Sequence, residues 1–311
     1  MSAFWILMEQ IELFVVYMLL GVVLVKTKVM NQQSLDVLSR FVVKMGLPMM
    51  VFINTTTGVT QETLYSSFIV PVVAFVMFLL LMLLLLLLAR CFHLEGEHRN
   101  LFRAMGVFSN VGFMGIPVVT SMYPEKGMLY ISLFTTLDQF LLWTVGVKFS
   151  SPIGGENRFR PKKLVNPVTV AIVVAMVMIL LELPMPALLQ TAFTKVGSTT
   201  TPLAMIYLGG TVACMDVKRY VLKKEYYGIV LAKMLLFPVL FYLLTGLFPI
   251  AGDVRMVLSL IASLPSMTSV VMMAGASGSD ADYATGGVCV TTLYSIITMP
   301  IVCWILQLLA G

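Results

Sequence analysis

Two charged side chains sit inside long apolar stretches of this sequence. Asp138 lies within residues 128–149 and Lys233 within residues 227–248. An ionisable group among apolar residues is costly to bury and usually serves a function. Asp138 could carry a coupled proton, or it could form a structural charge pair with Lys233. Both interpretations stay open.

The other polar candidates surround two interruptions of the hydrophobic pattern. Residues 101–123 read LFRAMGVFSNVGFMGIPVVTSMY, and residues 254–275 read VRMVLSLIASLPSMTSVVMMAG. Each stretch is long enough to cross a bilayer, yet each has Pro and small polar residues near its middle. A helix broken at that depth must line a cavity or be buried in protein. Broken helices at matching positions of two repeats point to the binding site of a secondary transporter.

We expect the substrate-binding residues at these interruptions and on the spans beside them: Asn110, Gly112, Gly115, Pro117, Pro265, Ser266, Thr268, Asn54 and Gln139. Simpler interpretations remain for several of them. Pro can be a harmless kink, and Gly112 with Gly115 could serve close helix packing. Asn110 could cap a half-helix, and Asn54 with Thr55 could do the same at the end of a span.

Catalytic and metal chemistry are not expected. His93 and His98 occur with Glu95 and Glu97 in CFHLEGEHR, which we interpret as a solvated loop rather than a metal site. The four cysteines are too widely spaced for a paired metal motif: Cys91, Cys214, Cys289 and Cys303. A membrane enzyme would need a nucleophile with its base, and Asp138 alone supplies neither. The sequence therefore predicts no metal, no cofactor and no catalytic residue.

The composition is that of a membrane protein. The 311 residues are 59% hydrophobic and 11% charged, and the mean hydropathy is +0.97. One soluble core cannot bury that much apolar surface. Apolar runs of about 20 residues, the length that crosses a bilayer, predict ten spans: 3–25, 37–55, 64–89, 101–123, 128–149, 166–183, 196–214, 227–248, 254–275 and 283–309.

Ten spans divide into two sets of five, and an odd number gives the second set the opposite orientation. We predict a first five-helix repeat over residues 1–149, a short basic loop over 150–165, and a second, inverted repeat over 166–311. At a rise of 1.5 Å per residue, Asn110 lies roughly 10 Å in from Arg103, and Pro265 about 15 Å in from Arg255. Both interruptions thus approach the midplane. Half-helix N-termini meeting there favour an anion.

The basic residues set the orientation. Most of the 20 Lys and Arg residues fall in the loops after spans one, three, five and seven. Under the positive-inside rule these loops are cytoplasmic and both termini are outside, in the plasma or inner membrane. The loop around Asp280 and Asp282 breaks the pattern because it carries no basic residue. A nucleic-acid partner is not expected, since the positive charge is scattered over short loops.

Several short motifs occur along the chain in the same order as in a known family. Ser109 to Pro117, SNVGFMGIP, resembles the broken fourth helix of the auxin efflux carrier family, which includes plant PIN-type exporters and bacterial dicarboxylate permeases. The other matching motifs are Gly46-Leu47-Pro48, Asn166-Pro167 with Thr169, Leu208-Gly209, Leu264-Pro265 and Met299-Pro300. The resemblance covers nearly the whole chain. Two departures are the short loop after residue 149, where plant members have a long insert, and Ser266, where they commonly have Gln.

The resemblance implies an all-α fold of ten transmembrane helices in two inverted repeats, with helices 4 and 9 broken and crossing. Helices 1, 2, 6 and 7 would form a scaffold that often dimerises, and helices 3–5 and 8–10 a transport part that moves against it like an elevator. The implied substrates are small organic anions, auxin-like monocarboxylates or malate- or malonate-like dicarboxylates. The alternative is a membrane sensor that uses the same fold to bind a ligand without moving it.

Overall fold

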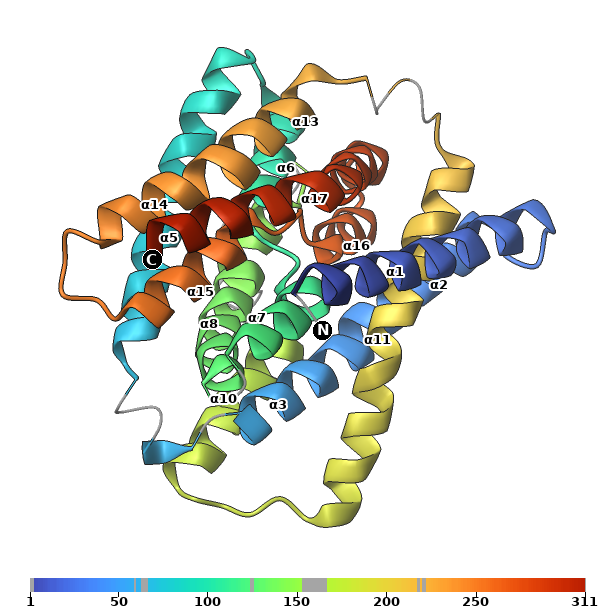
Figure 1. The fold of residues 1–311 in the computed structure, drawn as a ribbon. Coiled ribbons are helices and arrows are strands. Elements are labelled where there is room, and N and C mark those ends of the chain that lie inside the picture. Colours follow the sequence, from blue (N-terminus) through green and yellow to red (C-terminus); the bar gives the residue numbers. More distant parts are fainter. Residues whose placement is uncertain are drawn as a thin grey trace.

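The structure, a computed structural model, describes residues 3–58, 60–62, 67–123, 126–152, 167–216, 219 and 222–310. This part of the chain is helical, apart from turns and one isolated antiparallel bridge. Most of the predicted basic loop at 150–165, together with Asn166, lies outside the described residues. The ribbon in Figure 1 shows a bundle in which several helices are broken or bent.

The first half of the chain contains both uninterrupted and interrupted helices. Its elements are α1 (Ala3–Lys26), α2 (Gln32–Phe41), η1 (Val42–Gly46), α3 (Leu47–Gly58), α5 (Ile69–Cys91), α6 (Gly96–Val107), η2 (Val111–Gly115), α7 (Ile116–Met122), α8 (Gly127–Leu141), η3 (Leu142–Gly146) and α9 (Val147–Phe149). The η elements are π-helical turns. Such turns distort a helix locally and occur often at functional sites.

The second half also contains both uninterrupted and interrupted helices. Its elements are α10 (Pro167–Leu180), α11 (Ala187–Cys214), α13 (Lys224–Gly228), η5 (Ile229–Leu236), α14 (Phe237–Thr245), α15 (Gly252–Ser263), α16 (Thr268–Ser277) and α17 (Ala281–Ala310). Within the described residues, three stretches are long and apolar enough to cross a bilayer without interruption: Ile69–Cys91, Lys224–Thr245 and Ala281–Ala310.

Every predicted span overlaps a helix, and the two predicted interruptions are present between α6 and α7 and between α15 and α16. The ten-span inverted repeat as a whole stays a prediction. Several helices begin earlier than the predicted spans: α2 at Gln32 rather than 37, α6 at Gly96 rather than 101, and α11 at Ala187 rather than 196. The difference is largest for α11. Its first turns contain Gln190, Thr194 and Lys195, which lower the local hydropathy, and they are largely exposed.

The helices pack in two groups. In the first group α1 crosses α11, and α3 packs against α10 and α11. The crossing is so close that a Cβ added at Gly209 would lie 1.9 Å from the carbonyl oxygen of Met18. In the second group α5, α6 and α8 pack together, as do η5, α14, α15, α16 and α17. In Figure 1, α5 and α14 lie at the left of the molecule and α11 at the right.

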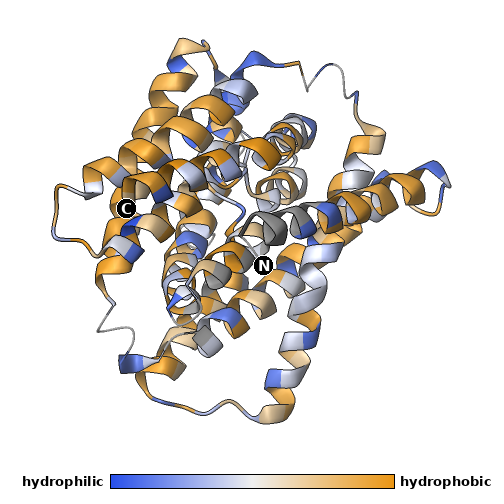
Figure 2. Cartoon of the chain, in the orientation of Figure 1, coloured by the Kyte–Doolittle hydropathy of each residue, from blue (hydrophilic) through white to orange (hydrophobic). Residues whose placement is uncertain are grey.

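The surface of the bundle is apolar along the helices. Figure 2 shows hydrophobic residues over most of their length and hydrophilic residues mainly near the helix ends and loops. On α5, Leu79 and Leu83 are each 55% exposed, while Leu81 and Leu85 on the other side of the same helix are fully buried. An apolar helix that exposes leucine in this way fits a lipid environment, because water would oppose it.

Candidate functional site

The two broken helices meet at their breaks. The residues after α6 and after α15 are extended, with φ −88° and ψ 119° at Phe108 and φ −62° and ψ 150° at Leu264. The two extended segments run antiparallel. The Asn110 N–H donates to the Pro265 carbonyl at 2.9 Å, and the Met267 N–H donates to the Phe108 carbonyl at 3.0 Å. Each break thus supplies partners for backbone groups that the other has freed, which hydrocarbon could not do.

Neighbouring helices hold the second break in place. The Lys233 ammonium on η5 donates to the Leu264 carbonyl. The Ser266 N–H donates to the Thr291 hydroxyl of α17 at 3.2 Å. Both contacts satisfy backbone groups that would otherwise be buried without a partner, and such groups are costly. The break between α15 and α16 is therefore supported from two other elements.

A small cavity lies beside the crossing. Its volume is about 20 Å³, and it is lined by Leu47, Met50, Val51, Asn54, Asn110, Val111, Gly112, Thr135, Asp138, Gln139, Met267 and Ser269. These residues come from α3, the first break, α8 and the second break. A cavity needs roughly 10–15 Å³ to hold one water molecule, so a larger ligand requires this site to widen.

The cavity brings together five of the residues that the sequence singled out. Asn54, Asn110, Gly112, Asp138 and Gln139 all line it, although they lie in three separate spans. Gly112 has room around it, since an added Cβ would meet only the Met50 Cε atom, at 3.7 Å.

The remaining candidates lie next to the crossing rather than on the cavity. Pro265 contributes a backbone carbonyl, and Ser266 and Thr268 are fully buried. At Gly115 an added Cβ would approach the Leu264 side chain to 3.0 Å, which fits the packing interpretation for that glycine. The side chain of Pro117 lies outside the described part.

A polar chain runs along α8 into the cavity. The Trp143 Nε1 donates to the Gln139 Oε1 at 3.3 Å, and the Gln139 Nε2 donates to the Asp138 Oδ2 at 3.2 Å. Among the described residues, the Asp138 Oδ1 and the Thr135 hydroxyl have no partner. The predicted pair of Asp138 with Lys233 is not a contact pair in the described structure, although the two charges interact electrostatically. Its functional role stays a prediction.

Seven lining residues were not among the predicted site residues: Leu47, Met50, Val51, Val111, Thr135, Met267 and Ser269. Thr135 lies one helical turn before Asp138, so the i, i+3 spacing on α8 could have found it. Met50 had no signal beyond its place near Pro48. Ser269 directly follows Thr268, the last residue that was predicted at the second break.

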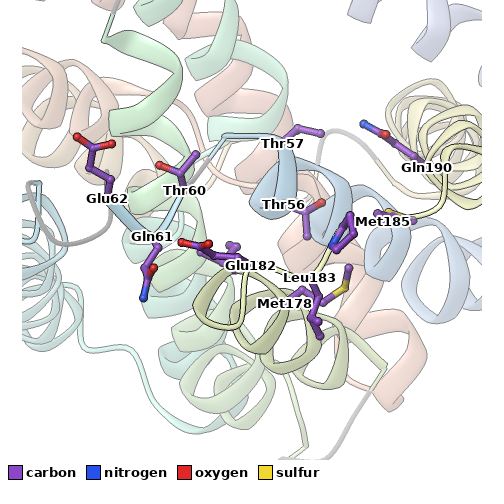
Figure 3. A pocket seen from close by; sticks show the side chains of 12 residues that line it. Thr56, Thr57, Thr60, Gln61, Glu62, Met178, Glu182, Leu183, Met185 and Gln190 are labelled. Carbon is purple, nitrogen blue, oxygen red and sulfur yellow. The ribbon is translucent and has the colours of Figure 1, made fainter.

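A second and larger cavity, of about 530 Å³, lies between the end of α3 and the α10–α11 connection (Figure 3). Glu62 and Glu182 line it together with Thr56, Thr57 and Gln190, and no basic side chain lines it among the described residues. Two carboxylates make this cavity a poor place for an anion.

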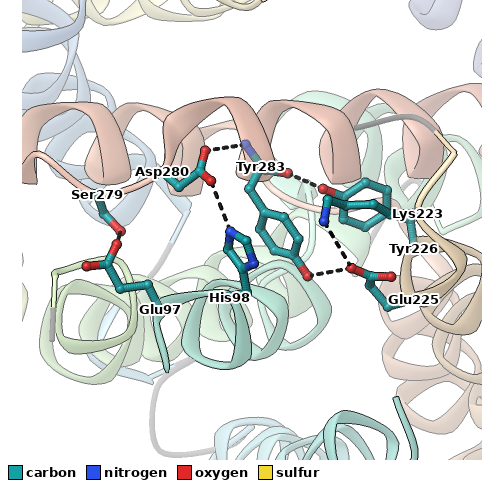
Figure 4. Close-up of polar contacts among 8 residues, drawn as sticks. All are labelled: Glu97, His98, Lys223, Glu225, Tyr226, Ser279, Asp280 and Tyr283. Atoms are coloured by element: carbon teal, nitrogen blue, oxygen red, sulfur yellow. Dashed lines mark hydrogen bonds and ion pairs between the residues drawn. The ribbon is translucent and has the colours of Figure 1, made fainter. Parts of the chain in front are cut away.

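A polar cluster joins the start of α6 to the start of α17 (Figure 4). His98 contacts Asp280 at 3.0 Å, and its ring stacks on Tyr283 at 4.2 Å between centroids. The Ser279 hydroxyl donates to Glu97, and the Tyr283 hydroxyl donates to Glu225. The prediction of a solvated loop was therefore wrong for His98, which lies on α6. No group of three metal-ligating side chains occurs in the described structure.

A matching contact joins the start of α15 to the start of α8. The Tyr130 hydroxyl donates to Asp253 at 2.7 Å, and Lys126 lies 3.6 Å from the same carboxylate. Arg255 stacks over the ring of Tyr242 at 4.3 Å and donates to its carbonyl. Each broken helix is thus fastened at its first turn to a helix from the other half of the chain, α6 to α17 and α15 to α8.

Crossing broken helices inside an apolar helical bundle, with a partly polar cavity beside them, are typical of a membrane transport protein. The chain belongs to the membrane transport protein family, whose sequence profile matches residues 5–303. This confirms the resemblance to the auxin efflux carrier family seen in the motifs.

Two relatives are transporters by name. An uncharacterized transporter of Methanocaldococcus jannaschii is 22% identical over 289 residues, which are 89% of this chain and 92% of the relative. A candidate malonate transporter of Rhizobium meliloti is 24% identical over 281 residues, 86% of this chain and 85% of the relative. The family and both relatives are transporters rather than enzymes.

Proposed function

We propose that this protein is a secondary transporter of small organic anions, which bind at the crossing of the two broken helices. The observation that carries the proposal is the cavity there, where Asn54 and Asn110 face the start of α16. The name of the Rhizobium relative, which mentions malonate, supports a carboxylate as the substrate.

The start of α16 suits an anion. Met267, the residue before the helix, makes no capping hydrogen bond with its side chain. The first N–H groups of a helix have no partner within the helix, and they carry partial positive charge. Met267 and Ser269 line the cavity, so this helix end lies beside the proposed substrate. The amide groups of Asn54 and Asn110 can add hydrogen bonds.

Movement of one part against another is the proposed mechanism. The group of α1, α3, α10 and α11 would be the scaffold, and the groups around α8 and α15 the moving part. An apolar groove of about 440 Å³ between α8 and α10, lined by Leu133, Phe140 and Val173 among others, separates the two parts on the lipid side. The cavity of about 20 Å³ fits a closed state of an alternating-access cycle.

The arrangement in the membrane follows from the charges. The basic loops would be cytoplasmic and both termini outside, in the plasma or inner membrane, and two copies would pair through their scaffold helices.

The direction of transport and its driving force depend on whether a second ion moves with the substrate. An anion leaving a negative-inside cell gains about 2.3 kcal/mol per charge per 100 mV, so export needs no coupling ion, whereas import does.

Uptake into proteoliposomes tests the proposal. Radiolabelled malonate and a panel of monocarboxylates should enter vesicles that contain the protein faster than protein-free vesicles of the same lipid, with and without imposed proton, sodium and voltage gradients. Saturable binding without any uptake or exchange would identify a sensor instead. Neither binding nor uptake of any carboxylate would contradict the proposal.

A further inference from the structure

Asp138 gives the cavity an acidic side chain, which a site that only binds anions does not need. Asp138 is fully buried. Its Oδ2 accepts from Gln139, but its Oδ1 has no partner among the described residues. A buried carboxylate oxygen without a donor is costly. The molecule that fills the cavity is therefore expected to bring a donor to this atom.

Asp138 puts an acidic side chain, with an acceptor oxygen that has no partner among the described residues, on one side of the cavity. Asp138 is the ionisable residue among those that line the cavity, since α3, the two breaks and the rest of α8 contribute amides, hydroxyls and apolar groups. Lys233 on η5 is the charged group that interacts with Asp138 from outside the lining. Its ammonium also donates to the carbonyl of Leu264 at the second break, so it gives Asp138 Oδ1 no hydrogen bond.

The other side of the cavity has the opposite preference. The uncapped start of α16, a helix of ten residues, lies there with Met267 and Ser269 on the lining. Asn110, which is 2% exposed, adds an amide group. A carboxylate fits this side, because the start of a helix favours negative charge. The cavity thus pairs an anion-binding side with an acceptor side.

We propose that the substrate is a small acid with one carboxylate for the α16 side and a hydrogen-bond donor for Asp138 Oδ1, as in a half-protonated dicarboxylate. This inference rests on the proposed function. A fully ionised dicarboxylate would place its second carboxylate against Asp138, and two like charges repel strongly where water is excluded. The half-protonated form instead donates its remaining proton to Oδ1. One proton then moves with each substrate molecule and stays on the substrate, so Asp138 does not have to change its own protonation.

Three ligands built on the same three-carbon backbone separate this inference from ordinary anion binding: malonate, its monoamide and its monomethyl ester. The monoamide has one carboxylate and permanent N–H donors, whereas the monoester has one carboxylate and no donor. Calorimetric Kd values for the purified wild-type protein would be measured between pH 5 and pH 8. At pH values above the second pKa of malonate, its Kd should rise about tenfold per pH unit, because the half-protonated fraction of malonate falls about tenfold per pH unit. The monoamide should bind independently of pH, and at least tenfold more tightly than the monoester.

The Asp138→Asn variant gives the matching test on the protein. An Asn amide can donate to the second carboxylate, so the rise of the malonate Kd with pH should disappear. Asp253→Asn, the same change in the contact with Tyr130 away from the cavity, should keep the wild-type slope. If Asp138→Asn does not fold, the Kd values of the three ligands for the wild-type protein still test the inference.

A malonate Kd that does not change with pH in the wild type would overturn the inference, as would equal binding of monoamide and monoester. So would an unchanged slope in a folded Asp138→Asn variant. In each of these cases a carboxylate still binds, so the proposed function survives. If no carboxylate binds at any pH, the proposed function fails as well.

Discussion

The two breaks look alike in sequence but differ in how they are held. The first break lines the cavity with three consecutive residues, Asn110, Val111 and Gly112, and continues into the π-helical turn η2. The second break is supported by Lys233 and Thr291 from other helices, and α16 is buried from Thr268 to Ala274. We infer that the second break is the fixed side of the site and that the first break is the side that adapts.

The position of proline fits this difference. Pro265 lies in the extended segment of the second break itself, next to Leu264. In the first half, Pro117 lies in the first turn of α7, several residues after the extended backbone at Phe108. Proline is common at the start of a helix, because a backbone N–H at that position would have no partner within the helix and its absence costs nothing. Pro117 therefore marks where the second half-helix resumes, and Pro265 marks the break.

Removing the support of the second break should have the largest effect. In Lys233→Met the carbonyl of Leu264 loses its donor, and Asp138 loses a nearby positive charge, so we expect a loss of about 3 kcal/mol in unfolding free energy. Thermal unfolding in detergent measures it. Lys126→Met is the control, because Lys126 is 62% exposed and its ion pair is worth little. A wild-type melting temperature would show that the second break does not depend on Lys233.

The same variant tests the charge pair that the sequence suggested. If Asp138 and Lys233 stabilise each other, Lys233→Met combined with Asp138→Asn should lose less stability than the sum of the single variants. Additive losses would leave Lys233 with the role of a backbone support alone.

Asn110→Leu, in the first break, should impair binding more than folding. The side chain lines the cavity and is almost fully buried, so the substrate would lose a polar contact that leucine cannot replace, at a cost of about 2 kcal/mol. Malonate binding should weaken at least tenfold. Ser109→Ala is the matched control, since Ser109 is buried next to Asn110 but does not line the cavity. Unchanged affinity in Asn110→Leu would remove Asn110 from the site.

Thr291→Val should produce a smaller loss, confined to stability. The change keeps the shape of the side chain but leaves the Ser266 N–H without its partner, which costs about 1 kcal/mol or slightly more. Binding should stay within about twofold of the wild type. Thr285→Val on the same helix is the control, because the Thr285 hydroxyl bonds to the carbonyl of Ala281 one turn earlier. Equal melting temperatures for the two variants would contradict the role of Thr291.

Sequence reasoning predicted where the chain is apolar and where two helices break, because both leave a local signature. It also singled out Asn110 and Asp138, which line the cavity, since polar residues are conspicuous in apolar spans. It could not find the partners of the second break. Lys233 and Thr291 reach it from far along the chain, and no local pattern shows which carbonyl or N–H a distant side chain will meet. The contact of His98 with Asp280, 182 residues away, was missed for the same reason.

The contacts at the first turns of the broken helices should give the smallest effects, and they extend the comparison to the helix ends. Tyr130→Phe removes the hydrogen bond to Asp253, and His98→Asn removes the stacking on Tyr283. Both sites are partly exposed, and His98 and Asp280 have 41% and 28% of their side-chain surface exposed. We therefore expect losses of about 1 kcal/mol or less in unfolding free energy from each change.

The same two variants test the fixed and adaptable sides through hydrogen exchange. If the first break is the adaptable side, His98→Asn, at the start of α6, should also speed hydrogen exchange in α6 and η2. Tyr130→Phe, at the start of α15, should leave exchange at the second break unchanged, because Lys233 and Thr291 still hold it. Faster exchange at the second break in Tyr130→Phe, with none at the first break in His98→Asn, would reverse the assignment of the fixed and adaptable sides.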